Sequence, residues 1–368
     1  MTKIYLIRHT HAEGNACHMM QGFWDGGVTE LGKKQVKALE ARFRDLPVDA
    51  VYASDLYRAR YTAAAIAGPH GLSLVTDPEL RELNIGPWET RFYANLRQED
   101  PERMHQFRYD PEHFSLPGAE TFAQVAERMQ RAMERISRRH EGQTVAVVSH
   151  GASIRCFLWR ACGLPLADVE GLPLMRNTAV TTLEWEDGRF RLLGLNDYSH
   201  ISDLIPARAP DLRHEPLDLW QEARYYKDCY RNAWLAAHGN LDGYFADWYL
   251  QAAREHQAAD PLAVLKLLDG EEPVGLVDLD TLRGAAEGWG WLSLLYLKPE
   301  YRNRGLGIQL LARAVFHYRR LGRRVLRLNV AEENAPALAF YRREGFRLAE
   351  SRPDGLLTLE KSLGGPEE

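Results

Sequence analysis

The stretch IYLIRHTHAEGN, residues 4–15, sets the interpretation of the whole sequence. It begins with four large apolar residues in a row, which is the pattern of a short strand that is buried on both faces. Arg8 and His9 follow at the point where that strand would end. Functional loops of an open parallel sheet lie at the carboxyl ends of its strands, so we expect His9 to belong to a functional site.

Strand-like and helical segments alternate over residues 1–205. Apolar runs at 51–53 and 145–148 are similar to the first one, and helical patterns occupy residues 30–44, 56–68 and 120–138. This alternation predicts an α/β domain with a doubly wound, mostly parallel sheet that is covered by helices.

A second α/β unit is predicted in the remainder of the chain. Three prolines punctuate residues 206–216, and we interpret this segment as a linker. The second domain would contain one long helical region at about 217–257, strands near 262–268, 273–280, 289–297 and 324–331, and a helix at about 305–321. We therefore expect two domains, at 1–205 and 217–364.

The composition is that of a globular protein of about two domains, with 368 residues, 45% of them hydrophobic and 26% charged. No apolar stretch approaches the roughly 20 residues that span a bilayer, and the N-terminus lacks the features of a signal peptide. We therefore expect a cytoplasmic protein without a membrane partner. The net charge of -5 argues against general nucleic-acid binding. The four cysteines form no CxxC pair, which favours free thiols over disulfides.

Two histidines and two arginines are expected to surround one anion. His150 follows its own apolar run as His9 does, so both should reach one crevice. If Arg8 and Arg58 reach it too, phosphate is the natural ligand, because a guanidinium matches its oxygens bidentately. A neutral imidazole held in line with phosphorus can attack it, which would make His9 a phosphohistidine. Glu82 would then protonate the leaving alkoxide.

These residues stand in a recognisable series of motifs. The segments are LIRHT (6–10), GFWDGGVTELGKKQ (22–35), SDLYRARYTA (54–63), LRELNIGPWE (80–89), VVSHG (147–151), Asn177-Thr178 and NDYSH (196–200). Over about the first 200 residues the sequence resembles the histidine phosphatase superfamily, also called the phosphoglycerate mutase-like family. The resemblance implies that His9 is the phosphorylated nucleophile, Glu82 the proton donor and His150 a further catalytic and phosphate-binding residue. It also implies that Arg8, Asn15 and Arg58 bind phosphate, and that this domain needs no cofactor.

Two departures from the family pattern come directly after His9. The usual glycine is Thr10, and the usual glutamate with threonine or serine is His11-Ala12. The contacts to a substrate beyond its phosphate are therefore left open. The longer insertions of the cofactor-dependent mutases are not evident in a domain of this size, which favours a phosphatase over a mutase.

A metal cluster is an alternative interpretation of the same region. His9, His11 and His18 with Asp25 carry groups that ligate metals, and alternate residues of an extended chain share a face. Arg8 would repel a cation beside its proposed ligand, so we favour a phosphate site without a metal.

A glycine-rich loop before a helix marks the second domain. In LKPEYRNRGLGIQLL, residues 297–311, the spacing is Arg302-x-x-Gly305-x-Gly307. Glycines let backbone amides approach an anion, and the dipole of the following helix points at it, which suits a pyrophosphate. The alternative is a solvated basic helix face, since residues 298–327 contain nine lysines or arginines and one acid.

The segments LSLLYLKPEYRNRGLG (292–307) and LNVAEENAPALAFYRREGF (328–346) extend this loop into a longer motif. They are similar to the GNAT acetyltransferase superfamily, and the resemblance covers residues 262–363. It implies a mixed-sheet GNAT fold with acetyl-CoA as cosubstrate and Tyr341 as the general acid. The implied acetyl-CoA contacts are the backbone of Leu295, Tyr296 and Leu297, the loop residues Arg302, Asn303, Arg304, Gly305, Leu306 and Gly307, and Asn334.

The acceptor of the acetyl group is indicated only by class, as a small-molecule or peptide amine. The family's first strand is not obvious, and residues 208–260, in the half that normally binds the acceptor, are aromatic-rich and mostly helical in pattern. Aromatic residues at helical spacing usually pack in a core, and an acceptor cage is the alternative.

We therefore expect a bifunctional enzyme, in which a phosphatase for a small phosphorylated metabolite is joined to an N-acetyltransferase. One alternative is phosphoryl transfer of the mutase type to an organic acceptor. Another is a regulatory protein whose second domain binds acetyl-CoA without turnover. The sequence indicates neither an oligomeric state nor a coupling between the two domains.

Overall fold

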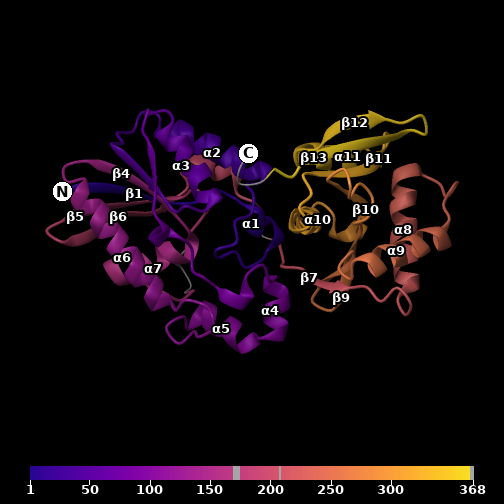
Figure 1. Cartoon of the computed structure of the whole chain (residues 1–368), viewed down its shortest axis with the longest axis horizontal. Coiled ribbons are helices and arrows are strands. Elements are labelled where there is room, and N and C mark those ends of the chain that lie inside the picture. Colours follow the sequence, from indigo (N-terminus) through magenta and orange to yellow (C-terminus); the bar gives the residue numbers. More distant parts are fainter. Residues whose placement is uncertain (169–174, 207–208, 365–368) are drawn as a thin grey trace. The chain divides into compact units, whose positions relative to one another are not determined.

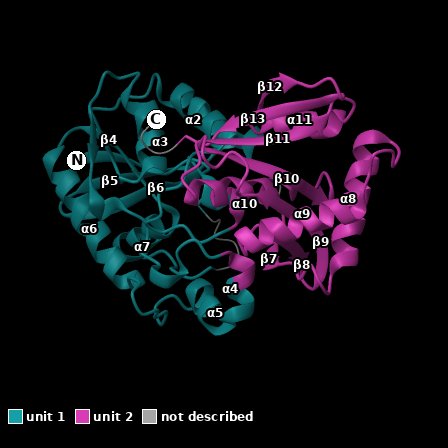
Figure 2. Cartoon of the chain, turned by 45° about the vertical axis from the view of Figure 1, so that its right-hand side comes forward, with its two compact units in different colours: residues 1–15, 19–91, 96–205 teal, residues 16–18, 92–95, 206–368 magenta. Residues whose placement is uncertain are grey.

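Two separate β-sheets organise the chain in the computed structural model, which describes residues 1–168, 175–206 and 209–364 (Figure 1). Each sheet belongs to one of two units, coloured separately in Figure 2. The N-terminal unit contains residues 1–15, 19–91 and 96–205, and the C-terminal unit contains residues 16–18, 92–95 and those from 206 onward. Both units combine helices with a sheet, as the alternating patterns predict.

The N-terminal sheet has the order β3-β2-β4-β1-β5-β6. Its strands are β1 (Thr2–Arg8), β2 (Ala50–Ala53), β3 (Leu74–Thr76), β4 (Thr144–Ser149), β5 (Val180–Glu186) and β6 (Arg189–Asp197). The first four strands of that order pair in parallel, while β5 and β6 are antiparallel additions at one edge. The prediction of a mostly parallel sheet is confirmed.

Helices cover both faces of this sheet. The helices of the first 205 residues are α1 (Glu13–Cys17), α2 (Glu30–Phe43), α3 (Tyr57–Ala67), α4 (Tyr93–Glu99), α5 (Pro101–Tyr109), α6 (Phe122–Arg139) and α7 (Gly151–Cys162). Figure 1 shows α2 and α3 on one face, with α6 and α7 on the other. Tyr5 and Ile7 pack with Leu39 and Phe43 of α2, while Ile4 on the opposite face is also fully buried. Burial on both faces explains the unbroken apolar run of β1.

The C-terminal sheet has the order β12-β13-β11-β10-β9-β8-β7. Its strands are β7 (Arg213–Pro216), β8 (Val264–Asp269), β9 (Glu272–Asp280), β10 (Trp289–Leu297), β11 (Val325–Ala331), β12 (Arg347–Ser351) and β13 (Leu356–Ser362). Only β10 and β11 pair in parallel, so the sheet is mixed, as expected. Its helices are α8 (Ala223–His238), α9 (Ala246–Ala259), α10 (Gly307–Arg320) and α11 (Ala335–Arg343).

The prediction of one helical region at 217–257 was wrong, because two helices occupy it. Gly239 ends α8 in the left-handed region, with φ at 72°, and Gly243 adopts φ of 74° in the connection to α9. Glycine reaches this region without a steric penalty, so the pair of glycines turns the chain between two amphipathic helices.

The predicted linker at 206–216 also needs correction, because its last residues form the edge strand β7. Residues 207 and 208 of that segment lie outside the described residues. Pro216 is tolerated because β7 pairs only with β8, and an edge strand can leave one N–H position unpaired. Strand β7 precedes α8 and is the first strand of the C-terminal unit. The sequence did not reveal this strand.

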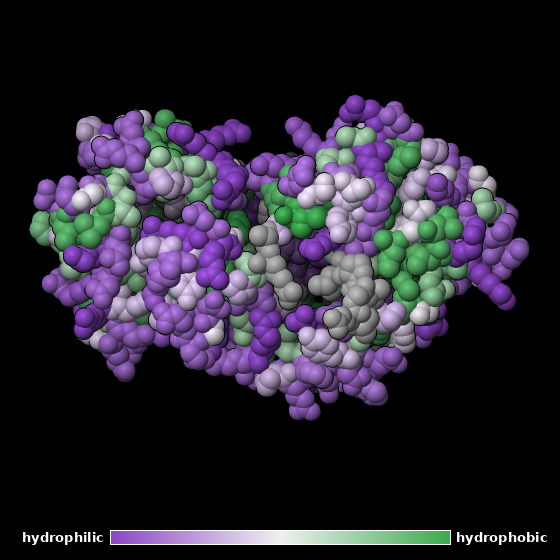
Figure 3. All heavy atoms as spheres, turned by 180° about the vertical axis from the view of Figure 1, so that it is seen from behind, coloured by the Kyte–Doolittle hydropathy of each residue, from purple (hydrophilic) through white to green (hydrophobic). Residues whose placement is uncertain are grey.

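Hydrophilic residues cover most of the face seen in Figure 3, and hydrophobic residues form separate small patches among them. The exposed aromatic residues include Trp220, Phe245 and Trp248. Among the described helices, none combines the length and apolar character that crossing a bilayer requires. All four cysteines are free thiols, as predicted, and only Cys162 is partly exposed.

Candidate functional site

The carboxyl ends of β1 and β4 bring His9 and His150 together. Arg8 pairs with Ser149 in the parallel register, and the amide of His9 donates to the carbonyl oxygen of Ser149 over 2.9 Å. The next residue of each strand is a histidine, and the two ring centroids lie 5.1 Å apart. The predicted convergence of these two histidines is therefore present, and adjacent parallel strands cause it.

The ring of His9 is held in one tautomer. Its Nδ1 lies 2.6 Å from the carbonyl oxygen of Thr10, which can only accept a hydrogen bond. The proton of a neutral His9 therefore lies on Nδ1, and Nε2 carries the lone pair. This arrangement leaves Nε2 as the nucleophilic atom.

Burial and nearby cations keep both rings neutral. Burial lowers the pKa of His9 well below its usual value, and the charges of Arg58 and Arg8 lower it further. The pKa of His150 falls well below its usual value for the same reasons, burial first and Arg58 second. Both imidazoles are thus uncharged at neutral pH, although cationic groups surround them.

Arg58 is the fixed cation of the site. Its side chain is fully buried, and its guanidinium donates to the carbonyl oxygens of Trp24 over 3.0 Å and Gly22 over 2.8 Å. Burial lowers the pKa of Arg58 to about 10, so it stays charged at neutral pH. Its Nε is buried without a hydrogen-bond partner among the described residues, and such a donor favours an anionic ligand.

His150 also has unused hydrogen-bonding capacity. It is fully buried at the N-terminus of α7, and neither ring nitrogen has a partner within the described part of the chain. A Cβ on Gly151 would lie 3.3 Å from Nε of Arg8, so the Arg8 side chain lies against the start of this helix. Two guanidiniums, an unpartnered imidazole and a helix N-terminus together suit a phosphate group.

Glu82 lies at the same helix end. Its carboxylate accepts from the amides of Ala152 over 3.2 Å and Ser153 over 3.0 Å, and from the Ser153 hydroxyl over 3.2 Å. The charge of Glu82 raises the pKa of Arg58, which places this carboxylate beside the cationic cluster. The structure thus brings together Glu82, His9, Arg58 and His150, which are far apart in the sequence.

Asn15 lies beside the loop that follows β1. Its Oδ1 accepts from the amide of Ala12 over 3.0 Å and from Nδ2 of Asn177 over 3.4 Å. Asn177 also donates to the carbonyl oxygen of His9 over 2.9 Å. The motif residues Asn15 and Asn177 therefore fix the backbone around His9, and phosphate binding by Asn15 remains a prediction.

Thr10 and His11, which depart from the family pattern, anchor the loop that follows β1 to α2. The hydroxyl of Thr10 donates to the carbonyl oxygen of Gly32 over 2.7 Å, and Nδ1 of His11 lies 2.8 Å from the Thr29 hydroxyl. A Cβ on Gly32 would lie 2.1 Å from the carbonyl oxygen of His11, so only glycine permits this approach. Nowhere in the described ranges do three or more His, Cys, Asp or Glu residues gather as a metal site.

Sequence reasoning missed Arg128 and Glu120, which hold the segment that carries Glu82. Arg128 is only 8% exposed and forms an ion pair of 2.8 Å with Glu120. A signal was available, because Arg128 occupies the apolar face of α6 between Val125 and Ala132. A charged residue on a buried helix face needs a partner.

In the C-terminal unit, β10 diverges from β11 along residues 295–297, whose backbone was predicted to contact acetyl-CoA. The two strands pair only from Trp289–Leu292 to Val325–Leu328, although β10 continues to Leu297. Beyond Leu292, β10 pairs with β9 alone. The main chain of β10 at 295–297 therefore forms no ladder with β11.

The predicted loop at 302–307 leads directly into α10. Asn303 and Gly305 adopt left-handed φ angles of 58° and 76°, and Nε of Arg302 donates to the carbonyl oxygen of Leu297 over 2.9 Å. Helix α10 begins at Gly307, and its N-cap residue Leu306 offers no side-chain acceptor. The first N–H groups of the helix thus have the geometry of an anion site.

The two later motif residues take different positions. Asn334 caps α11, with its Oδ1 accepting from the amide of Ala337 over 3.3 Å. Tyr341 packs edge-to-face between Phe340 and Phe346 and is 8% exposed. Burial raises the pKa of Tyr341, so its phenol stays protonated at neutral pH.

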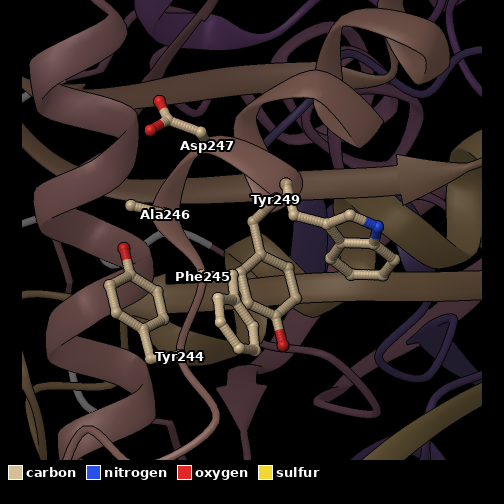
Figure 4. Close-up of a pocket in the computed structure, with 6 residues that line it drawn as sticks. Tyr244, Phe245, Ala246, Asp247 and Tyr249 are labelled. Carbon is tan, nitrogen blue, oxygen red and sulfur yellow. The ribbon is translucent and has the colours of Figure 1, made fainter.

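The aromatic residues of α8 and α9 mainly pack on one another. The rings of Tyr230 and Tyr249 stack directly, with their centroids 4.0 Å apart. Residues 244–249 line a hollow of about 760 Å³, and Asp247 points away from the rings of Tyr244 and Tyr249 (Figure 4). Direct stacking leaves no space between the two rings, which favours the packing interpretation over an acceptor cage.

Comparison with known proteins covers both units. A family model for the histidine phosphatase superfamily (branch 1) matches residues 4–198, and one for the acetyltransferase (GNAT) family matches residues 219–346. A protein of Erwinia tasmaniensis named as a probable phosphoglycerate mutase GpmB is 33% identical over 208 residues, which are 55% of this chain and 96% of that protein. The namesake from Yersinia pestis (strain Pestoides F) is 33% identical over 187 residues, 51% of this chain and 86% of its own.

A solved structure supports the fold of the first unit. The protein YhfR of Bacillus stearothermophilus is 32% identical and superposes with a TM-score of 0.53, covering 55% of this chain and 100% of its own. This likeness supports the α/β fold of the N-terminal unit.

The lowered pKa values predict an unusual histidine titration in the ligand-free protein. At pH 6.5 the ring signals of His9 and His150 should be those of neutral imidazole, because charging either ring would bury a cation beside Arg58. His113 should be mostly protonated at that pH, since its hydrogen bond to Asp110 raises its pKa. NMR titration of histidine-labelled protein checks this, with His9→Gln and His150→Gln assigning the signals. A His9 midpoint at or above 6.5 would contradict the site geometry.

Proposed function

The chain belongs to the histidine phosphatase superfamily (branch 1), and on that premise we propose that its N-terminal unit hydrolyses phosphomonoesters through a phosphohistidine at His9. The observation that carries the proposal is the ring of His9. It is neutral, it has its lone pair on Nε2, and it lies 5.1 Å from the ring of His150. We propose a small phosphorylated metabolite as the substrate class, because the residues described at the site suit a phosphate group and define no further part of a substrate.

The first step forms the phosphoenzyme. Nε2 of His9 attacks phosphorus, and the bond between phosphorus and the ester oxygen breaks. Arg8, Arg58 and His150 stabilise the charge on the phosphoryl oxygens. The leaving alkoxide takes a proton from Glu82, which lies at the same end of α7 as His150.

The second step releases phosphate. Glu82, now a carboxylate, accepts a proton from a water molecule that attacks the phosphoryl group. The bond between phosphorus and Nε2 breaks, and the lone pair returns to His9. The products are inorganic phosphate and the unmodified enzyme.

Phosphoryl transfer to a second hydroxyl is the competing function, because the Erwinia tasmaniensis protein is named as a probable mutase. The two functions differ only in the group that accepts the phosphoryl group from His9. Quantitative release of inorganic phosphate supports hydrolysis, whereas phosphate that stays on an organic product supports transfer.

Labelling of His9 tests the proposal. Incubation with a phosphomonoester that carries labelled phosphorus, followed by alkaline quenching, should label the wild-type protein at an acid-labile group. His9→Ala should take up no label, because it lacks the attacking nitrogen. His113→Ala, which removes an exposed histidine of the same unit, is the matched control and should be labelled like the wild type. Equal labelling of His9→Ala and the wild type would overturn the assignment.

For the C-terminal unit we propose acetyl transfer from acetyl-CoA to an amine, and its match to the GNAT family supports this proposal. The residues present fit this cosubstrate. The segment 295–297 of β10, which does not pair with β11, suits the amide groups of the pantetheine arm. The loop at 302–307 with the N-terminus of α10 suits the pyrophosphate. Asn334 is the further contact that the motif assigns.

In this reaction the amine nitrogen attacks the thioester carbonyl carbon, and the bond between that carbon and sulfur breaks. The departing sulfur takes a proton from the Tyr341 phenol, the nitrogen loses its extra proton to solvent, and the phenolate regains a proton from solvent. The buried position of Tyr341 keeps the phenol protonated until that moment. A regulatory unit that binds acetyl-CoA without turnover is the competing function.

Replacement of Gly305 tests the CoA loop. Gly305→Asp adds a negative charge and forces a side chain onto a φ of 76°, so CoA affinity should fall roughly 100-fold or more. Gly322→Asp is the matched control, because Gly322 has φ of 70° at the other end of α10 and no neighbour in the way of a Cβ. Isothermal titration with CoA measures both variants. Undiminished affinity in Gly305→Asp would remove the loop from the CoA site.

Replacement of Tyr341 by phenylalanine tests the general acid. The ring and its packing remain while the hydroxyl is lost, so kcat should fall roughly 100-fold or more with little change in acetyl-CoA affinity. Phe346→Leu disturbs the packing of the same ring but keeps the hydroxyl, and it should retain most of the turnover. CoA release with an amine that serves as acceptor is the measurement. Unchanged turnover in Tyr341→Phe would leave this residue a packing role only.

A further inference from the structure

We propose that Arg128, held by Glu120, is a positioning residue for the proton donor Glu82. The inference rests on the proposed phosphatase function, because it concerns the acid of that reaction. Arg128 lies on α6 and does not touch the substrate. It acts through the backbone of the segment that carries Glu82.

All five N–H groups of the Arg128 guanidinium are used, and three of them hold backbone carbonyls of one short segment. Nη1 donates to the carbonyl oxygens of Glu79 over 2.8 Å and Arg81 over 2.7 Å, and Nη2 donates to that of Glu82 over 2.8 Å. The other two donors form a bidentate pair with the Glu120 carboxylate, over 2.8 Å and 3.0 Å. An arginine side chain has five such donors in a rigid plane.

Glu120 continues the same clamp on the far side of Glu82. Its carboxylate accepts from the amide of Asn84 over 2.9 Å, and its own amide donates to the carbonyl oxygen of Asn84 over 2.9 Å. Thr121, the next residue, starts α6 with a capping box, so the clamp is anchored to a well-formed helix end. The backbone is therefore fixed from residue 79 to residue 84.

The two ends of Glu82 are held by different elements. Its backbone is bound by Arg128, and its carboxylate accepts hydrogen bonds from the N-terminal turn of α7. Proton transfer needs donor and acceptor within hydrogen-bond reach, and a shift of about 1 Å costs up to about 100-fold in rate. The clamp thus sets the distance between Glu82 and the leaving oxygen. A lysine has three donors and no plane, and cannot replace it.

The test compares leaving groups in variants of Arg128. Arg128→Met should lower kcat for an alkyl phosphate about 100-fold, because its alkoxide needs the proton, while 4-nitrophenyl phosphate should lose little. KM should change little for either substrate, since the phosphate ligands are intact. Arg128→Lys should behave like Arg128→Met although it keeps the charge. Arg131→Met, which removes only an exposed ion pair with Glu79 one turn along α6, should match the wild type.

Equal losses on both substrates would show a purely structural role and overturn the inference. Wild-type kinetics in Arg128→Met would do the same. If Arg128→Met does not fold, as judged by thermal unfolding, Glu120→Gln serves in its place. It keeps the shape of the partner and removes its charge, and it should show the same dependence on the leaving group.

The double variant Glu82→Gln with Arg128→Met separates this inference from the proposed function. Glu82→Gln alone should already lose the alkyl phosphate selectively, and adding Arg128→Met should cause no further selective loss. If Glu82→Gln shows no selectivity, the assignment of Glu82 as acid fails. If Glu82→Gln is selective but Arg128→Met is not, only the positioning role of Arg128 fails.

Discussion

The parallel pairing of β1 with β4 is the constraint on which the N-terminal site depends. One hydrogen bond, from the amide of His9 to the carbonyl oxygen of Ser149, fixes the residues that leave the two strands. It brings two histidines together at the edge where the amides of α7 also converge. Burial and the nearby arginines then lower the pKa values of these two histidines, whose positions the strands already determine. The chemistry of His9 is therefore a consequence of strand register.

The parts of this fold that the sequence predicted are those whose signal is local. Strands β1 and β4 are buried on both faces, so each reads as an unbroken apolar run. Strand β12 has no such signal, because all of its residues are exposed and no alternation marks it. Of the site, the motif positions were predictable, and the geometry brings together His9, Glu82, Arg58 and His150. The charge of Arg128 on the apolar face of α6 was visible in the sequence, but its contacts with the segment of Glu82 were not, because those partners are backbone oxygens about 46 to 49 residues away.

The C-terminal unit shows the same limit in another form. The loop before α10 could be read from its glycines, because a left-handed backbone conformation has a direct sequence requirement. The divergence of β10 from β11 could not, because it depends on where two distant strands stop pairing. The edge strand β7 was hidden for a related reason, since Pro216 is a poor strand residue everywhere except at an edge.

The clamp around Glu82 has a consequence for how this protein can change over generations. Arg128 binds the main-chain oxygens of Glu79 and Arg81 and leaves their side chains outside the contact. The contact with Arg128 therefore places no direct requirement on the side chains at these two positions. Arg81 lies over the ring of Phe23, close to the loop that supplies the ligands of Arg58. Selection can thus alter the surroundings of Arg58 at residue 81, while the main-chain contacts that hold Glu82 stay in place.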